Sequence, residues 1–210
     1  VGRFYTIPVL AGIGIILNLI CVLIFFNKKL KSNKVFCYLG FKAIFDIGTL
    51  IVRILYVIVK CKTCSFSSTY SIFLASNLIN DYIKQWFAIL SVLSEILATF
   101  YQYIQMKNIL PRFQKLNQYI LISILFLIVC SFYTYELFST DIYVSKVLKD
   151  KNNKTTLIYK DRESEFGQSN AFKCIKIVGN LFRDFIGVLV IILLNFLIFY
   201  QFRSIVANKK

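Results

Sequence analysis

The sequence predicts an all-α membrane protein built as a polytopic transmembrane helical bundle. Apolar residues make up 58% of the 210-residue chain, and they are grouped in long blocks. A helix that spans a bilayer needs about 20 mostly apolar residues, and five blocks reach that length. None of them alternates apolar with polar residues, so strands of an outer-membrane barrel are not expected. The blocks are Ile7–Phe26, Val35–Val59, Ile72–Met106, Tyr119–Phe138 and Phe185–Phe202.

These blocks define the expected organisation of the chain as a single domain over residues 1–210. The expected helices cover about 7–27, 35–59, 71–106, 118–138 and 181–203. In the long connection 139–180, Ile142–Leu148 and Thr155–Lys160 are rich in β-forming residues and flank a polar stretch, which is typical of a short β-hairpin. The chain begins without a methionine and stops soon after the fifth block, which indicates a fragment.

The positive charge of the chain lies mainly in the connections between the blocks. A formal net charge of +15 would suggest a nucleic-acid partner in a soluble chain. No glycine-rich phosphate loop or ladder of basic and aromatic residues is present, so we expect lipid headgroups and no nucleic acid. The connections 27–34 and 107–118 and the tail after residue 203 are the most basic. The positive-inside rule therefore places them in the cytosol and the N-terminus outside.

Glycosylation and disulfide signals favour an outside position for the 139–180 loop. Asn153 begins an Asn-Lys-Thr sequon, which is glycosylated only on the luminal side. Cys174 follows the predicted hairpin, on the same side as Cys61 and Cys64, where disulfides persist. A Cys64–Cys174 bond is favoured, because it would tie the hairpin over the third helix. The spacing of Cys61 and Cys64 also fits a redox or metal pair, but the chain has no histidine and no soluble α/β context.

Polar residues inside the apolar blocks are the strongest functional signal. Asn18 is the only amide in the first block, and Asp46 lies near the middle of the second. An ionisable group at membrane depth costs roughly 2.5–3.5 kcal/mol on insertion scales, so it marks a functional site by default. The alternative is a structural salt bridge with Lys42, one helical turn before Asp46. Glu95, a second intramembrane acid, is expected to pair with Lys42.

The spacing of these residues resembles that of a rhodopsin-like (class A) G-protein-coupled receptor. Asn18 and Asp46, separated by a short basic loop, match the asparagine of the family's first helix and the aspartate of its second. Ser91 precedes Gln102 by the interval between the family's serine and the arginine of its Asp-Arg-Tyr motif. A hairpin followed by a cysteine is similar to the family's second extracellular loop. The resemblance covers nearly the whole chain, as helices one to five of seven.

The chain departs from the family at several positions. Tyr101-Gln102 replaces the acid–arginine pair, so the family's ionic latch to the sixth helix cannot form in its usual way. The fourth block lacks the family's tryptophan, and the fifth lacks its proline. Neither Cys61 nor Cys64 falls at the family's usual position near the third helix. The pattern therefore indicates a divergent receptor.

The resemblance implies a multi-pass receptor of the plasma membrane that transduces an extracellular ligand, such as a peptide, to a heterotrimeric G protein. It implies helix rearrangement rather than enzyme activity. It also implies a sodium ion in a hydrated network of Asn18, Asp46 and Ser91. The G-protein-facing residues would be Tyr101, Gln102, Tyr103, Lys107 and Arg203.

The outer halves of the second, third and fifth blocks are unusually polar, and this is where we expect the ligand. A basic, partly hydrated cavity would suit an anionic group such as the C-terminal carboxylate of a peptide. The alternative is an interfacial belt of Lys and Arg side chains that reach out to the headgroups. The predicted ligand-pocket residues are Arg53, Asp81, Lys84, Gln85, Ala88, Arg183 and Asp184.

A transporter or channel is the alternative functional class, with Asp46, Glu95 and Lys84 forming an ion or proton path. Transporters commonly have internal repeats and helices interrupted by Gly or Pro. The sequence shows neither, because its two prolines, Pro8 and Pro111, lie at block ends. An enzyme is not expected, since there is no histidine, no metal cluster and no nucleophile elbow.

Overall fold

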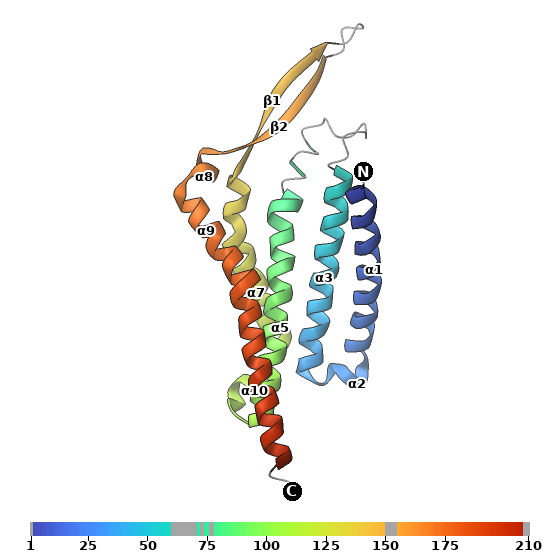
Figure 1. Cartoon of the computed structure of the whole chain (residues 1–210), viewed down its shortest axis with the longest axis vertical. Helices are drawn as coiled ribbons and strands as arrows, with labels where there is room; N and C mark the ends of the chain where they lie inside the picture. Colours follow the sequence, from blue (N-terminus) through green and yellow to red (C-terminus); the bar gives the residue numbers. More distant parts are fainter. Residues whose placement is uncertain (1, 60–70, 72–73, 76–77, 150–154, 208–210) are drawn as a thin grey trace.

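The computed structural model describes residues 2–59, 71, 74–75, 78–149 and 155–207, and these form a bundle of long helices (Figure 1). Within this part of the chain, five helical stretches are long and apolar enough to cross a membrane. The long helices are α1 (Gly2–Phe25), α3 (Lys34–Val59), α5 (Lys84–Lys107), α7 (Gln118–Phe132) and α10 (Gly187–Ala207). The short ones are α2 (Lys28–Lys31), α6 (Pro111–Lys115), α8 (Glu165–Gln168) and α9 (Asn170–Leu181).

Three of the long helices continue into irregular helical segments at the same end of the bundle. A π-helical segment, η1 (Leu78–Ile83), precedes α5, and a 3-10 segment, η2 (Tyr133–Phe138), follows α7. A second π-helical segment, η3 (Phe182–Ile186), joins α9 to α10. π-Helical turns are rare in proteins, and many of those known lie at functional sites. A binding site is therefore expected at this end of the bundle.

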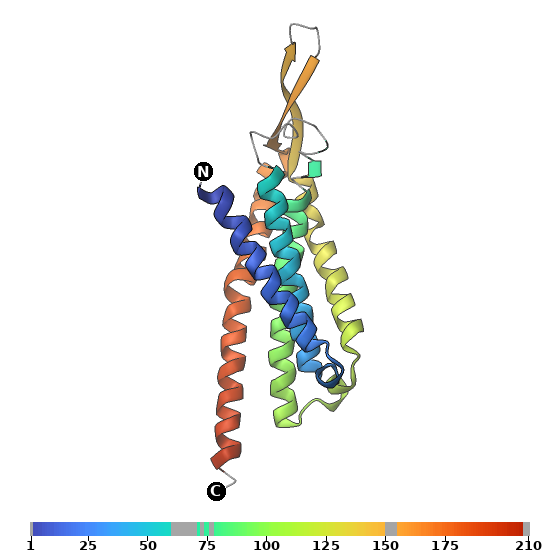
Figure 2. The same cartoon turned by 90° about the vertical axis from the view of Figure 1, so that its right-hand side faces the viewer.

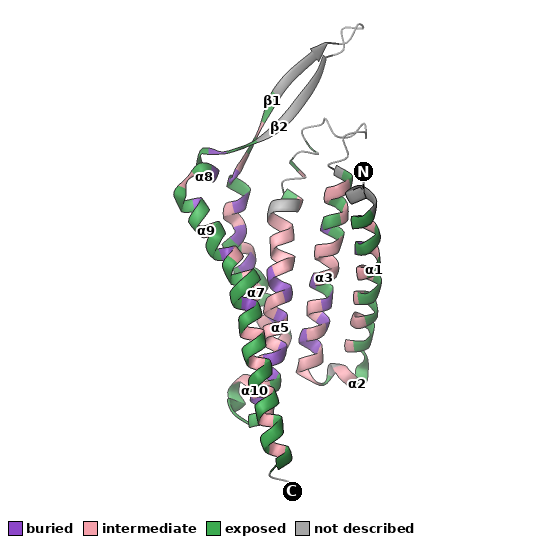
Figure 3. Cartoon of the chain, in the orientation of Figure 1, coloured by how far each residue is buried: buried purple, intermediate pink, exposed green. Residues whose placement is uncertain are grey.

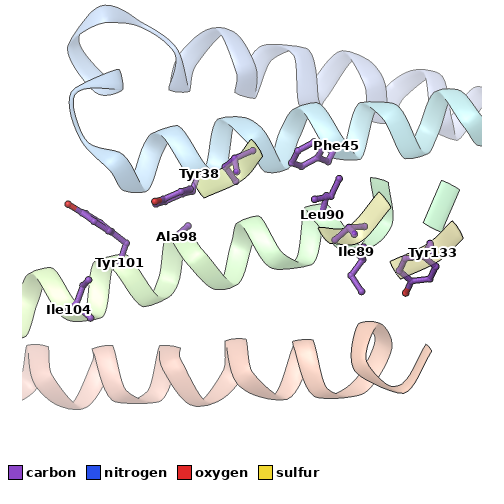
Figure 4. Close-up of a cluster of buried hydrophobic side chains, with 10 residues drawn as sticks. Tyr38, Phe45, Ile89, Leu90, Ala98, Tyr101, Ile104 and Tyr133 are labelled. Atoms are coloured by element: carbon purple, nitrogen blue, oxygen red, sulfur yellow. The ribbon is translucent and has the colours of Figure 1, made fainter. Parts of the chain in front are cut away.

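Helix α5 is the centre of the bundle. It packs against α3, α7 and α10, whereas α1 packs on the far side of α3 (Figure 1). The fully buried side chains between these helices include Tyr38, Leu90 and Ile104. Figure 4 shows α3 and α5 contributing most of this cluster, with Tyr38 and Tyr101 facing each other. Most of the buried apolar cluster therefore lies between α3 and α5.

The outer surface of the bundle is apolar, as expected for a protein in lipid. Side chains such as Leu23 on α1 and Phe196 on α10 are 74% and 69% exposed, and Figure 3 shows long exposed stretches on both helices. In a soluble protein, apolar exposure on this scale would mark an interface. Here it fits helices whose outer faces meet lipid or further helices.

The fifth membrane-spanning stretch begins earlier than the sequence suggested. It was expected at 181–203, after a loop that continued to residue 180. Instead α8 and α9 occupy the end of that loop, and the apolar stretch runs from Asn170 to Ala207. Ser169 caps α9, because its Oγ accepts a hydrogen bond from the Phe172 amide at 3.2 Å. Such a cap satisfies an amide that a helix start leaves unpaired.

Strands β1 (Thr140–Lys149) and β2 (Thr155–Glu163) form an antiparallel pair with a bulge between Val144 and Lys146. The pair and the N-terminus lie at one end of the bundle, and α2, α6 and the C-terminus lie at the other (Figures 1 and 2). Its base is fixed to the bundle, since the Ser164 Oγ donates to the Phe138 carbonyl at 2.5 Å. The two ends of the molecule are thus chemically distinct.

The α3–α5 packing predicts a large difference between two identical substitutions. In Gly48→Ala, the added Cβ would lie 2.6 Å from the Phe87 ring, whereas at Gly12 it would meet no described atom within 4 Å. Overpacking a well-packed contact costs about 1–3 kcal/mol. We expect Gly48→Ala to lower the melting temperature of the protein in lipid nanodiscs, and Gly12→Ala, the matched control on α1, to leave it unchanged or raise it. Equal melting temperatures would contradict this packing.

Candidate functional site

A charged cluster lies between α3 and α5 in the middle of the bundle. The Asp46 Oδ1 accepts a hydrogen bond from the Ser91 Oγ at 2.5 Å. The other carboxylate oxygen of Asp46 accepts from the Lys42 Nζ at 2.8 Å. The same ammonium lies 3.7 Å from the Glu95 Oε2. One cation and one hydroxyl therefore serve two acids on facing helices.

Helical spacing explains how these residues meet. Lys42 and Asp46 are one turn apart on α3, and Ser91 and Glu95 are one turn apart on α5, so each pair occupies one face of its helix. Because α3 packs along α5, the two polar faces are opposed. The side chains of Lys42 and Asp46 are each 29% exposed, so the cluster is partly shielded rather than sealed. The Lys42–Glu95 pair expected from the sequence is present as an ion pair.

Asn18 lies on α1, as the resemblance implied. Its Nδ2 donates to the Gly14 carbonyl of α1 at 2.9 Å, so the hydrogen bond observed is within its own helix. The structure brings Asp46 and Ser91 into direct contact and leaves Asn18 on the neighbouring helix. A network that joins Asn18 to Asp46 and Ser91 stays a prediction. The hydrogen bond observed is the one between Asp46 and Ser91.

A cavity of about 510 Å³ connects this cluster to the end of the bundle that carries η3. It lies between α3, α5, η3 and α10. Asp46 and Ser91 line it together with six of the seven residues predicted to contact a ligand, and Asp81 is the one predicted residue not among the lining residues. The lining residues are Asp46, Thr49, Arg53, Lys84, Gln85, Ala88, Ser91, Val92, Arg183, Asp184 and Val188.

Three of the lining residues were not predicted from the sequence. Thr49 lines the cavity between Asp46 and Arg53, and its helical spacing from both would have identified it. Val92 and Val188 carry no polar signal and could be found only from the packing of α5 on α10. Asp81 lies in η1, and its side chain is outside the part of the chain that the structure describes.

The outer part of the cavity carries a positive excess. Arg53, Lys84 and Arg183 line it. Arg183 is fixed by its neighbour Asp184, with Nε–Oδ1 and Nη2–Oδ2 distances of 2.6 and 2.7 Å. Its Nη1 also donates to the Gln85 Oε1, which joins η3 to α5. Since Asp184 is matched by Arg183, the outer wall keeps a net positive charge from Arg53 on α3 and Lys84 on α5, and this charge suits an anion.

The residues predicted to face a G protein lie at the opposite end and differ in exposure. Gln102, Lys107 and Arg203 are exposed, as a contact surface requires. Tyr103 is partly buried, with the Lys107 ammonium 5.4 Å from its ring centroid. Tyr101 is buried, with 7% of its surface exposed, so little of this side chain is accessible to a partner. Its place on a G-protein-facing surface stays a prediction.

Tyr101 helps to anchor the connection between α5 and α7. Its hydroxyl donates to the Gln114 carbonyl at 3.4 Å. The Lys34 Nζ donates to the same carbonyl at 2.5 Å and to the Leu116 carbonyl at 2.6 Å. Carbonyls left free after the short α6 helix need such donors. The start of α3 and the end of α5 together hold this connection in place.

The cysteine pairing expected from the sequence is not formed in this structure. Cys174 is an exposed free thiol on the helix α9. Cys64, its expected partner, lies outside the described residues. The sequon residue Asn153 also lies outside them. Neither Cys64 nor Asn153 contributes to the site as described.

The geometry around Asp46 does not fit the sodium ion that the resemblance implies. A sodium ion is a hard cation that needs several free oxygen ligands, as other hard cations do. One Asp46 oxygen is bonded to Ser91 and the other to the ammonium of Lys42. A metal ion at this carboxylate would have to compete with the positive charge of Lys42.

The Ser91 hydroxyl predicts a stability difference between two serines of α5. Ser91→Ala removes a donor from a carboxylate, a bond worth about 1–2 kcal/mol in a bundle of this kind. Ser94 is the matched control: it is 1% exposed, and its hydroxyl has no hydrogen-bond partner within the described ranges. We expect thermal unfolding in nanodiscs to show a lower melting temperature for Ser91→Ala only. A comparable loss for Ser94→Ala would show that the Asp46 contact is not the cause.

Comparison with known proteins adds no assignment to this site. No protein-family model matches the chain, and a search of curated proteins found no match. The site is therefore characterised by its own residues: a salt-bridged carboxylate between two helices, at the base of a cavity with basic walls.

Proposed function

We propose that this chain supplies five helices of a divergent seven-transmembrane receptor of the rhodopsin-like class, which transmits binding of an extracellular ligand to a cytosolic G protein. One observation carries the proposal. A single cavity contains both the Asp46–Ser91 contact and the outer polar residues Arg53, Lys84 and Arg183. A ligand in the outer part would therefore lie directly above the charged contact that joins α3 to α5.

The distribution of charge supports the orientation in a plasma membrane. The end that carries α2 and α6 has Lys28, Lys29, Arg112 and Lys115 in short connections, and short basic connections favour the cytosolic side. The β1–β2 pair and the N-terminus occupy the other end (Figure 2), which we assign to the outside. In this orientation the cavity opens toward the extracellular half, and the sequon at Asn153 faces a compartment where it can be glycosylated.

The charges of the cavity favour an anionic ligand group, such as the C-terminal carboxylate of a peptide. Arg53 lies on α3 and Lys84 on α5, so an anion between them would contact both helices. Hydrogen bonds between a carboxylate and charged donors are roughly twice as strong as neutral ones. Such a ligand would change the relative stability of two arrangements of α3 and α5, which is the requirement for signalling by population shift.

The cytosolic readout would use the surface formed by Gln102, Lys107 and Arg203. The family's arginine latch is replaced by Tyr101-Gln102. Tyr101 and Lys34 instead fix the connection between α5 and α7. A movement of α5 relative to α3 would therefore be passed to this connection, which a G protein can contact.

The proposal is tested with the full-length protein in cells that carry energy-transfer sensors for each G-protein class. A panel of synthetic peptides with free C-terminal carboxylates is applied, with the amidated form of each peptide as its control. We expect at least one free-acid peptide to dissociate a G protein, with Arg53→Gln weakening its potency about 10-fold or more, equivalent to about 1.4 kcal/mol. Lys29→Gln, an exposed residue of α2 outside the surface proposed for the G protein, should leave potency unchanged.

Two outcomes of this test would contradict the receptor proposal. The first is a protein at the cell surface that activates no G-protein class with any peptide and carries an ion or proton current. That result would favour the transporter or channel alternative, with Asp46, Glu95 and Lys84 on the path. The second is a complete coding sequence that encodes an internal repeat or twelve helices rather than two more.

A further inference from the structure

We propose that the ammonium of Lys42 is the resident cation of the charged cluster, and that it takes the place a metal ion would occupy beside Asp46. The inference rests on the positions of Lys42, Asp46, Glu95 and Ser91, and it holds whether or not the protein is a receptor. It predicts a membrane bundle whose central contact between α3 and α5 is independent of sodium.

The ammonium of Lys42 lies close to two carboxylates. Its Nζ lies 2.8 Å from the Asp46 Oδ2 and 3.7 Å from the Glu95 Oε2. Asp46 is on the same helix as Lys42, and Glu95 is on α5. The ammonium therefore lies between carboxylates of two different helices, as a bridging ion would. Its three N–H donors allow contacts with both carboxylates at once.

Both oxygens of the Asp46 carboxylate accept hydrogen bonds. One oxygen accepts the Ser91 hydroxyl at 2.5 Å, and the other accepts the Lys42 ammonium. Each oxygen of the carboxylate therefore has a donor, and one of the two donors carries a full positive charge. A sodium ion that bridged Asp46 to α5 would have to compete with that charge.

The cluster contains one cation, Lys42, and two acids, Asp46 and Glu95. Lys42 neutralises one of the two acids, and the remaining negative charge is best placed on Glu95. The side chain of Glu95 is 37% exposed, against 29% for Asp46 and Lys42. A more exposed carboxylate keeps more of its hydration and needs a counter-ion less. The Asp46 carboxylate, which needs a cation most, is the one in closest contact with the ammonium.

A covalently attached cation such as Lys42 has an advantage over a free sodium ion at this site. Lys42 is one helical turn from Asp46, so their pairing requires no ion to bind from solution. A sodium ion must lose part of its hydration shell and compete with that attached charge. Removing the ammonium would leave two carboxylates and a hydroxyl facing each other, and these are the oxygen ligands that a hard cation prefers.

The test measures thermal unfolding of the full chain in lipid nanodiscs, in sodium chloride and in N-methylglucamine chloride at matched ionic strength. The wild-type melting temperature is expected to be the same in both salts. Lys42→Met is expected to unfold at a lower temperature without sodium and to recover with a saturable sodium dependence. When sodium is ten times its Kd, its binding raises the ratio of folded to unfolded protein about 10-fold.

Two control variants assign the effect to charge and to Asp46. Lys42→Arg retains a cation, so it should behave as the wild type does. Lys42→Met combined with Asp46→Asn lacks both the ammonium and the main ligand, so it should show no sodium response.

A saturable, sodium-specific stabilisation of the wild type would overturn the proposal. A folded Lys42→Met protein without any sodium response would also overturn it. If Lys42→Met does not fold, the sodium dependence of the melting temperature is measured for the wild type and for Lys42→Gln, which keeps a donor without the charge. The same two outcomes then decide the proposal.

Discussion

The contact of Asp46 with Ser91 and Lys42 is the constraint on which the rest of the structure depends. An acid in the middle of an apolar helix is costly unless it is paired, and here each oxygen of the carboxylate has a donor. One donor comes from α3 and the other from α5. Satisfying the acid therefore requires α3 and α5 to lie side by side in a defined register. Helix α1 packs on α3, and α7 and α10 pack on α5.

The same register produces the cavity. Arg53 lies two turns beyond Asp46 on α3, and Lys84 lies two turns before Ser91 on α5. When Asp46 meets Ser91, these two cations are brought to the same depth. Arg183 completes the wall from η3, where Asp184 and Gln85 hold it. A basic outer cavity above a paired acid is thus a consequence of one helix–helix alignment. Any ligand that draws Arg53 and Lys84 together acts directly on this alignment.

Much of this arrangement could be read from the sequence, because it depends on spacing along single helices. Block length indicated the membrane-spanning helices, and the one-turn spacing of Lys42 from Asp46 indicated a salt bridge. The resemblance to a receptor family placed Ser91 opposite Asp46. The sequence left two readings open for Asp46, a polar network or a salt bridge. In the structure Asp46 makes both contacts at once, through different oxygens.

Other features depended on contacts between segments and could not be read in this way. The start of the fifth stretch at Asn170 follows from the Ser169 cap and from packing of α9, which the apolar pattern alone did not reveal. Tyr101 lies in a motif that suggested a partner surface, yet burial against Tyr38 and the bond to Gln114 give it an anchoring role. Motif position predicted the location of this residue but not its contacts with Tyr38 and Gln114.

A double-mutant cycle between Asp46 and Ser91 tests the central claim most directly. The free energy of unfolding is measured in nanodiscs for the wild type, Asp46→Asn, Ser91→Ala and the double variant. If the two side chains join α3 to α5 as described, the two losses are not additive, and the coupling energy is about 1–2 kcal/mol. Additive losses, within about 0.5 kcal/mol, would contradict the account, because the acid would then be held by something other than α5.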